Sequence, residues 1–236
     1  MVINRSREEW KSYGNVFDKF TEANLRKLSS QGYFEELESS LALGKEANVF
    51  IARTKDDDLI AVKIYRLENC NFNKMLSYII QDPRYLSLKG QRRKIIFAWT
   101  QREYRNLLKS RELVRVPTPI VCKDNIVLME LIDDGDKVSQ KLKDVKLENA
   151  QKTFDDVIDG VKKLFKGGLV HGDLSEYNIL IQQGKVVFID LSQMTPTDSS
   201  NAPELLKRDV NIICSFFNRR GLDLDSKTVY NSVVGK

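Results

Sequence analysis

The hydrophobic residues of this 236-residue chain change their spacing near its middle. Apolar runs of strand-like composition cover 34–43, 47–52, 59–65, 119–122 and 126–132. Beyond them, apolar residues recur every three or four positions, as in Phe154, Val157, Ile158 and Val161, which is the period of a buried helix face. A strand-rich half followed by a helix-rich half predicts an α+β fold. The first three strands are expected to form an antiparallel meander.

Helices are expected on both sides of these strands. Their spacing places them at 16–28, 95–113 and 154–165, with a last helix from Pro203 to Gly221. The Gln183-Gly184 pair predicts a hairpin turn. The expected division is an N-terminal helical extension (1–32), a β-rich lobe (33–132) and a helical lobe (133–236). Two lobes about a hinge near 133–136 would form a cleft for a ligand.

Composition excludes several classes of protein. The chain is 42% hydrophobic and 30% charged, which is enough apolar material for a core and too much for a disordered chain. No apolar run approaches the roughly 18 residues of a membrane span, and no secretory signal opens the chain, so a cytoplasmic protein without a membrane partner is expected. Cys70, Cys122 and Cys214 lie far apart without a CxxC pair, which disfavours disulfides and structural zinc.

A constellation of polar residues in the helical half gives the strongest chemical signal. It runs His171-Gly172-Asp173, then Asn178, and after eleven more residues Asp190, which ends an apolar run. An aspartate in a loop can orient an attacking hydroxyl, while an amide oxygen and a second carboxylate can hold the magnesium that bridges nucleotide phosphates. The spacing therefore predicts phosphoryl transfer, against the plainer alternative of a turn with incidental Asp and Asn.

Two residues of the first half suit the same chemistry. Lys63 lies within Ala61-Val62-Lys63-Ile64 in the third predicted strand, where protein kinases place a phosphate-binding lysine. Its alternative role is a charge that protects a sheet edge. Glu103, in the predicted 95–113 helix, is the candidate carboxylate for positioning Lys63, or else an i,i+4 partner of a neighbouring basic residue.

Together these motifs resemble the RIO family of atypical protein kinases, and within it the Rio1 branch of archaea and eukaryotes. The similar segments are 44–50, 169–180 and 189–193, and the likeness extends from about Gly14 to Gly221. The resemblance implies a two-lobed protein-kinase-like fold with an antiparallel-sheet N-lobe and a truncated, mainly helical C-lobe. It also implies ATP and Mg²⁺ (or Mn²⁺), serine autophosphorylation or ATPase activity, and a role in small ribosomal subunit maturation.

The resemblance assigns roles position by position. Asp173 would be the catalytic base, Asn178 and Asp190 the metal ligands, and Asp190 also the acceptor that forms an aspartyl-phosphate. Lys63 would contact the α- and β-phosphates, with Glu103 as its anchor. The other ATP-binding candidates are Gly44 in the phosphate-covering loop, Met129 as gatekeeper, Glu130 and Ile132 through backbone groups, and Val49, Ala61, Leu180 and Ile189 around adenine. For these last four apolar residues, ordinary core packing is the alternative.

The chain departs from ordinary kinases in three ways. A single glycine, Gly44, stands where a G-x-G-x-x-G loop would have three. Ala42 and Leu43 precede it, where the RIO family usually has small hydroxyl residues, which is a departure from that family's own pattern. Gly172 replaces the arginine that reads a phosphorylated activation loop, so no such switch is expected. Only twelve residues separate Asp190 from Pro203, too few for an activation segment.

The net charge of +5 is unevenly distributed. From Arg84 to Arg115 there are ten Lys or Arg against two acidic residues, a local charge of +8, while the rest of the chain carries −3. A solvated helix face is one interpretation, with a flexible loop within 84–94. The other is a contact surface for RNA phosphates across 84–115, where Tyr85, Trp99 and Tyr104 are interleaved with the basic residues.

The leading hypothesis is an ATP- and magnesium-dependent RIO-type serine/threonine kinase or ATPase acting on a pre-ribosomal small-subunit particle. The phosphate acceptor would be a protein serine, including one of its own, or water. One alternative is a small-molecule phosphotransferase of the aminoglycoside or choline kinase type, which shares the His-Gly-Asp loop. Another is a binding module for the ribosome that uses ATP as a conformational ligand.

Overall fold

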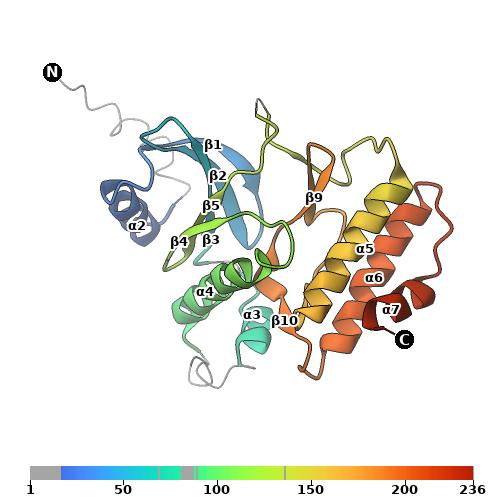
Figure 1. Ribbon diagram of the computed structural model, residues 1–236. Coiled ribbons are helices and arrows are strands. Elements are labelled where there is room, and N and C mark those ends of the chain that lie inside the picture. The colour runs from blue at the N-terminus through green and yellow to red at the C-terminus, as the bar shows by residue number, and fades with distance from the viewer. Residues whose placement is uncertain (1–16, 69, 81–87, 89, 136, 236) are drawn as a thin grey trace. The chain divides into compact units, whose positions relative to one another are not determined.

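A computed structural model describes residues 17–68, 70–80, 88, 90–135 and 137–235 (Figure 1). By its internal contacts the chain forms two compact units, Met1–Gln101 with Pro119–Leu131 and Arg102–Thr118 with Ile132–Lys236. The expected division at 1–32, 33–132 and 133–236 stays a prediction. Residues 1–16 and part of the expected flexible segment at 84–94 lie outside the described residues.

The first unit is built on a five-stranded antiparallel sheet. Its strands are β1 (Glu36–Leu43), β2 (Ala47–Arg53), β3 (Leu59–Tyr65), β4 (Pro119–Lys123) and β5 (Ile126–Glu130). They lie in the order β1-β2-β3-β5-β4, and every neighbouring pair is antiparallel. The predicted antiparallel meander is therefore confirmed for β1, β2 and β3, whereas β5 and not β4 lies next to β3.

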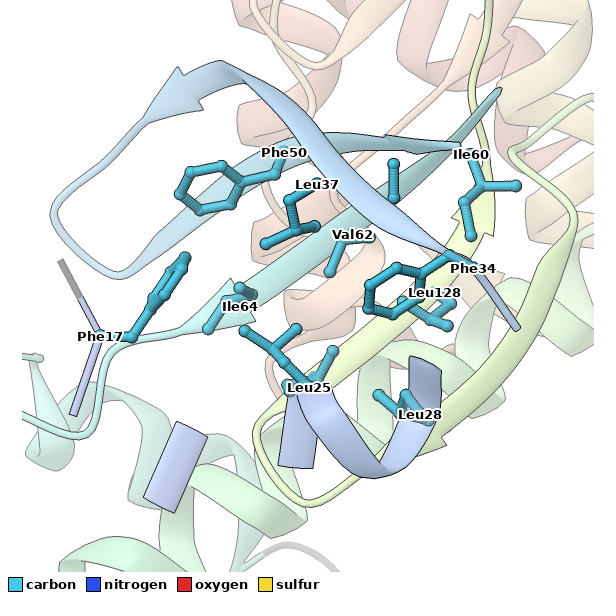
Figure 2. Close-up of a cluster of buried hydrophobic side chains, with 12 residues drawn as sticks. Phe17, Leu25, Leu28, Phe34, Leu37, Phe50, Ile60, Val62, Ile64 and Leu128 are labelled. Atoms are coloured by element: carbon cyan, nitrogen blue, oxygen red, sulfur yellow. The ribbon is translucent and has the colours of Figure 1, made fainter. Parts of the chain in front are cut away.

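Helix α2 (Lys19–Ser30) covers one face of this sheet. It begins after Asp18, whose Oδ1 accepts hydrogen bonds from the amides of Phe20 and Thr21 at 3.0 and 3.1 Å. Leu25 and Leu28 enter a cluster of buried side chains from the strands (Figure 2). The strand residues of the cluster are Leu37, Phe50, Ala52, Ile60, Val62, Ile64, Ile126 and Leu128. Because side chains alternate along a strand, the residues between them, such as Lys63, point to the other face.

Helix α4 (Arg92–Ser110) contributes to both units. In the first unit, Phe97 stacks on Phe20 with ring centroids 5.5 Å apart. Trp99 meets Tyr78 of α3 (Phe72–Ile79) edge-on at 5.7 Å. From Arg102 onward the helix belongs to the second unit. The sequence pattern does not predict α3, because eight residues give too few turns for a periodic signal.

The second unit contains neighbouring helices and two small sheets (Figure 1). The helices are α5 (Ala150–Lys166), α6 (Ala202–Asn218) and α7 (Ser226–Val234), and the strand pairings are β6-β8-β9 (Gln140–Lys141, Ile179–Gln182, Lys185–Phe188) and β7-β10 (Leu169–Val170, Thr195–Pro196). Phe154 of α5 and Phe217 of α6 meet edge-on at 5.4 Å, and α7 contacts both helices. None of the helices in the described ranges has the length and hydropathy that a membrane span requires.

The hairpin prediction in this unit is confirmed. The predicted helix that begins at Pro203 is confirmed as α6, but it ends before Gly221 and is not the last helix. Gln182 pairs with Lys185, and the turn residues Gln183 and Gly184 have φ of 49° and 76°. Helix α6 ends at Asn218, because the next amides bond in tight turns that close at Gly221 (φ 94°). The chain then forms α7, which begins after Asp225 and whose nine residues bury little apolar surface that could have marked it in the sequence.

Candidate active site

The Asp173 loop, residues 171–178, follows β7 directly. His171 is buried, with Nε2 3.2 Å from the Ile189 carbonyl oxygen and Nδ1 3.4 Å from the Asp173 amide nitrogen. One neutral tautomer satisfies both contacts, since Nε2–H donates and Nδ1 accepts. Burial lowers the pKa of His171 to about 4, so the ring is neutral near pH 7. This geometry gives His171 a structural role, because a neutral ring supports the loop through both nitrogens.

Two charged residues of α6 hold the same loop. Asp209 is buried and accepts hydrogen bonds from the amides of Gly172 and Leu174 at 2.7 and 3.0 Å. Burial raises the pKa of Asp209 to about 7, against the effect of these two amides. Arg208 donates to the Gly172 carbonyl, and its Nη2 lies 3.6 Å from Oδ1 of Asp173. The residues flanking Asp173 are thus fixed, while its own side chain stays 38% exposed.

Asn178 joins this loop to the strand that leads to Asp190. Its Nδ2 donates to the Asp173 carbonyl at 2.8 Å, and its backbone carbonyl accepts from the Ile189 amide at 3.0 Å. Since the donor end of the amide is used in this way, Asn178 would bind a cation through Oδ1. The two bonds of Asn178 therefore link Asp173 to Ile189, the residue that precedes Asp190.

The Asp190 segment, residues 189–195, follows β9. Asp190 has φ 60° and ψ 62°, a left-handed conformation that costs a residue with a side chain about 1 kcal/mol or more. Ser192 donates from Oγ to Oδ1 of Asp190 at 3.0 Å. Residues Leu191–Gln193 form a short 3-10 helix, and Asn106 of α4 donates to the Leu191 carbonyl. A non-glycine residue in this conformation needs such neighbours to hold it.

An amide oxygen from Asn178 and a carboxylate from Asp190 fit magnesium by their chemistry, because Mg²⁺ prefers hard oxygen ligands. Within the described part of the chain, no three His, Cys, Asp or Glu side chains gather to hold a metal by themselves. Magnesium usually takes one or two protein oxygens and completes its shell with phosphates and water.

Four candidate residues of the first unit, Val49, Ala61, Lys63 and Met129, share one face of the sheet. Val49 and Val127 lie opposite Lys63 on either side, and Met129 lies opposite Ala61. Directly opposed residues of antiparallel strands point to the same side, here the face away from α2. Lys63 is 8% exposed, and its Nζ lies 5.2 Å from the centroid of the Tyr65 ring.

Gly44 lies in the turn between β1 and β2. Its amide donates to the Ala47 carbonyl at 3.1 Å and to Oδ1 of Asn48 at 3.2 Å. A Cβ at this position would come within 2.7 Å of the Ala47 carbonyl oxygen, so the turn requires glycine here. This close approach is a physical reason for a single glycine in the turn.

The remaining candidates are distributed over both units. Glu130 ends β5 in the first unit. In the second unit, Glu103 is buried in α4, Ile132 is buried and its carbonyl accepts from the Ser139 amide at 2.9 Å, Leu180 lies in β8 and Ile189 precedes Asp190. Lys63 and its predicted anchor Glu103 therefore belong to different units, and each is more than nine-tenths buried.

Sequence reasoning missed Arg208 and Asp209. Asp209 carries a signal that could have found it, because it lies on the apolar face of α6 among Leu205, Leu206, Val210 and Ile213. A carboxylate at such a position is rarely buried without polar partners. Arg208 carries no comparable signal, since an arginine on an exposed helix face is ordinary.

Comparison with known proteins shows the family. The RIO domain model matches residues 48–230. The Rio1 proteins of Haloferax volcanii and Methanocaldococcus jannaschii, both named RIO-type serine/threonine-protein kinases, are 38% and 40% identical over 232 and 230 residues. The two matches cover 98% and 97% of this chain and 80% and 79% of those proteins.

A solved structure is also similar, the Rio2 kinase–ADP/Mg²⁺–phosphoaspartate complex from Chaetomium thermophilum. Its TM-score is 0.69 at 24% sequence identity, and the match covers 88% of this chain and 64% of that one. At this identity the likeness concerns the fold, and it confirms the predicted two-lobed kinase-like class.

The chain belongs to the RIO family of atypical protein kinases. Its relatives of 30–40% identity are Rio1 proteins from archaea and eukaryotes, so within the family it falls in the Rio1 branch as a RIO-type serine/threonine-protein kinase. The family prediction is thereby confirmed, and the alternative of a small-molecule phosphotransferase is disfavoured.

Proposed function

We propose that this protein transfers the γ-phosphoryl group of magnesium-bound ATP to a protein serine, its own chain included, or by way of Asp190 to water. The observation that supports this most directly is the pair of bonds made by Asn178. Through them the Asp173 loop and the Asp190 segment are held by one residue. Phosphoryl transfer depends chiefly on positioning and charge neutralisation, which such an arrangement provides.

In this proposal each residue of the second unit has one task. Asp173, with its carboxylate exposed and its flanks fixed, orients the attacking hydroxyl and accepts its proton. Oδ1 of Asn178 and the carboxylate of Asp190 hold magnesium, which when bound neutralises charge on the phosphates. His171, neutral and buried, keeps the Ile189 carbonyl in place.

The nucleotide would be held by the other candidates. Lys63 contacts the α- and β-phosphates with Glu103 as its anchor, and the Gly44 turn covers the phosphates. Met129 and the backbone groups of Glu130 and Ile132 take the adenine edge, while Val49, Ala61, Leu180 and Ile189 enclose the ring. Support comes from the shared sheet face of Val49, Ala61, Lys63 and Met129.

Transfer to water would take two displacements. A carboxylate oxygen of Asp190 attacks the γ-phosphorus, the bond to the β–γ bridging oxygen breaks, and ADP leaves with its electron pair. Water then attacks the aspartyl-phosphate, Asp173 accepts its proton, and inorganic phosphate departs as the Asp190 carboxylate is restored. The Rio2 complex, whose name includes a phosphoaspartate with ADP and Mg²⁺, supports this route by analogy.

The proposed setting is the cytoplasm, with a maturing small ribosomal subunit as partner. Part of the basic segment makes hydrogen bonds within the protein. Arg102 donates to backbone carbonyls, and Arg115 donates to the Val116 carbonyl and to Gln182. Arg92, Arg93 and Lys94 are exposed at the start of α4. Lys109 and Arg111 are exposed near the other end of the helix. An RNA contact would therefore depend on these exposed cations more than on Arg102 and Arg115.

Incubation with γ-labelled ATP and magnesium tests the proposal. Acid-stable label on serine supports the kinase reaction, and hydroxylamine-labile label supports the aspartyl-phosphate. Asp190→Ala should abolish both, and Asp173→Ala should slow turnover by about 10²-fold or more. Magnesium-dependent phosphate release that persists in Asp190→Ala would overturn the metal assignment.

Two further outcomes favour the alternatives. Label found only on a small alcohol would establish a small-molecule phosphotransferase. If Asp173→Ala lost turnover but bound the ribosomal particle normally, while Arg92, Arg93 and Lys94 changed to Gln abolished binding, the protein would be an ATP-gated binding module.

A further inference from the structure

Three polar residues form a stripe along the second half of α4. Arg102, Asn106 and Ser110 are spaced by four residues, so they lie on one face of the helix. Asn106 and Ser110 are buried, and Arg102 is half-buried. Polar side chains in such a place need hydrogen-bond partners, and theirs come from the segment that follows Asp190.

The stripe binds the main chain of that segment at successive positions. Asn106 Nδ2 donates to the Leu191 carbonyl at 2.7 Å. Arg102 donates from Nε to the Ser192 carbonyl at 3.1 Å and from Nη2 to the Met194 carbonyl at 2.6 Å. The Ser110 hydroxyl lies 3.2 Å from the sulfur of Met194. The two bonds from Arg102 are charge-assisted and therefore stronger than neutral ones.

These bonds begin one residue after Asp190. On its other side, the Ile189 amide is bonded to Asn178. Asp190 thus adopts its left-handed conformation between two fixed points, and its carboxylate accepts from Ser192, whose own carbonyl is bonded to Arg102. With only twelve residues between Asp190 and Pro203, there is no room for an activation segment to order this region. Helix α4 does so directly.

We propose that Arg102 and Asn106 are positioning residues that hold the carboxylate of Asp190 where it can bind magnesium. The inference rests on the proposed role of Asp190 as a metal ligand. The family relation does not assign this role to either residue.

The test uses the full chain with Arg102→Met, Asn106→Leu and Arg102→Lys. Hydrogen exchange of residues 189–195, measured without nucleotide, should become about tenfold faster in the first two variants, because the segment loses its anchors. The magnesium concentration for half-maximal turnover should rise about tenfold, as for residues that orient metal ligands. Binding of ATP without metal should stay within about twofold of wild type, since no nucleotide contact is removed. Arg102→Lys keeps a cationic donor, so its exchange rate and its magnesium requirement should each rise by only about threefold.

Two matched controls separate positioning from general loosening. Asn218→Ala also removes a side-chain amide bonded to a backbone carbonyl (Leu224, 3.0 Å), but on an exposed helix end. Arg26→Met removes an exposed arginine of α2. Both should leave exchange at 189–195 and the magnesium requirement unchanged.

Unchanged exchange and magnesium dependence in Arg102→Met and Asn106→Leu would overturn the proposal, as would an equal loss of metal-free ATP binding. Should these two variants fail to fold, hydrogen exchange and magnesium dependence are measured in Arg102→Lys instead. Wild-type values of both quantities in Arg102→Lys would overturn the proposal. Asp190→Asn separates the two claims: if it retains magnesium-dependent turnover, the proposed function fails, whereas exchange at 189–195 reports on the stripe independently of catalysis.

Discussion

The Asp173 loop and the Asp190 segment are both held by side chains from a helix, but the chemical groups differ. Helix α6 uses Asp209, a buried carboxylate whose pKa is raised to about 7 by its burial. Helix α4 uses a guanidinium and an amide, which do not titrate near neutral pH. The support of the first loop therefore responds to pH, and that of the second does not.

The largest effect on stability is expected from Asp209→Ala. Two buried amides, those of Gly172 and Leu174, lose their acceptor, so the free energy of unfolding should fall by about 3 kcal/mol in urea denaturation. Asp225→Ala is the matched control, since Asp225 also accepts from two amides but at an exposed helix start. Its cost should be about 1 kcal/mol. Equal losses of unfolding free energy in the two variants would show that burial does not strengthen the Asp209 contacts.

Gly172→Ala tests the close approach of the Asp173 loop to the Asp190 segment. Gly172 has φ 79°, and a Cβ there would lie 2.9 Å from the Gln193 carbonyl oxygen. We expect a loss of about 2 kcal/mol in unfolding free energy, from backbone strain and this contact together. Gly184→Ala, with φ 76° and open space around it, should lose only about 1 kcal/mol. If both variants lost the same amount, the close approach would be without consequence.

The pH dependence of stability distinguishes the two supports. His171 has a pKa of about 4 when folded against 6.5 unfolded, so the unfolded chain binds more protons and its contribution rises with pH across that range. For Asp209 the folded pKa is about 7 against 3.8, so its contribution falls as pH rises. The two trends offset each other in the wild type.

In Asp209→Asn the contribution of Asp209 to the pH dependence of stability is removed, so the contribution of His171 is no longer offset. Between about pH 4.5 and 6, its unfolding free energy should rise with pH more steeply than that of wild type by about 1 kcal/mol per unit. Denaturation at several pH values measures both slopes, and identical slopes would contradict the raised pKa of Asp209. Arg102→Met, on the other support, should leave the wild-type slope unaltered.

The smallest effect is expected from Ser192→Ala. The variant loses one half-buried hydrogen bond to Asp190, so unfolding free energy should fall by about 0.5–1 kcal/mol. Ser232→Ala, which removes an exposed hydroxyl bonded within α7, should cost about nothing. A large loss in Ser192→Ala would mean that the hydroxyl, more than the α4 stripe, holds the Asp190 segment.

Much of the fold could be predicted from periodicity. Short apolar runs predict β2 and β3, because strands of a sheet covered by other elements bury most of their residues. The three-and-four spacing from Phe154 predicts α5, because a helix buries one side. The pattern fails for α3 and α7, which are short and bury few residues that could mark them. The 182–185 hairpin is predicted correctly because Gly184 adopts the positive φ that such a turn needs without steric cost.

The candidate site also has a part that the sequence predicts and a part that it does not. The residues predicted to carry the chemistry, Asp173, Asn178 and Asp190, are close in sequence and recognisable by residue type, and their roles stay predictions. The residues that hold them, Arg102, Asn106 and Asp209, bind backbone carbonyls and amides far away in the chain. A backbone group has no residue type, so nothing in the sequence marks it as a partner.

The sequence by itself determined the family, the alternation that turns Lys63 away from the α2 core, and the chemical groups available for phosphoryl transfer. Only the tertiary structure decided how those groups are held. Asp209 of α6 accepts from amides of the Asp173 loop, and the polar stripe of α4 donates to carbonyls of the Asp190 segment. The physical reason is that local spacing fixes which face of an element is buried, whereas hydrogen bonds between distant segments exist only once the elements have packed.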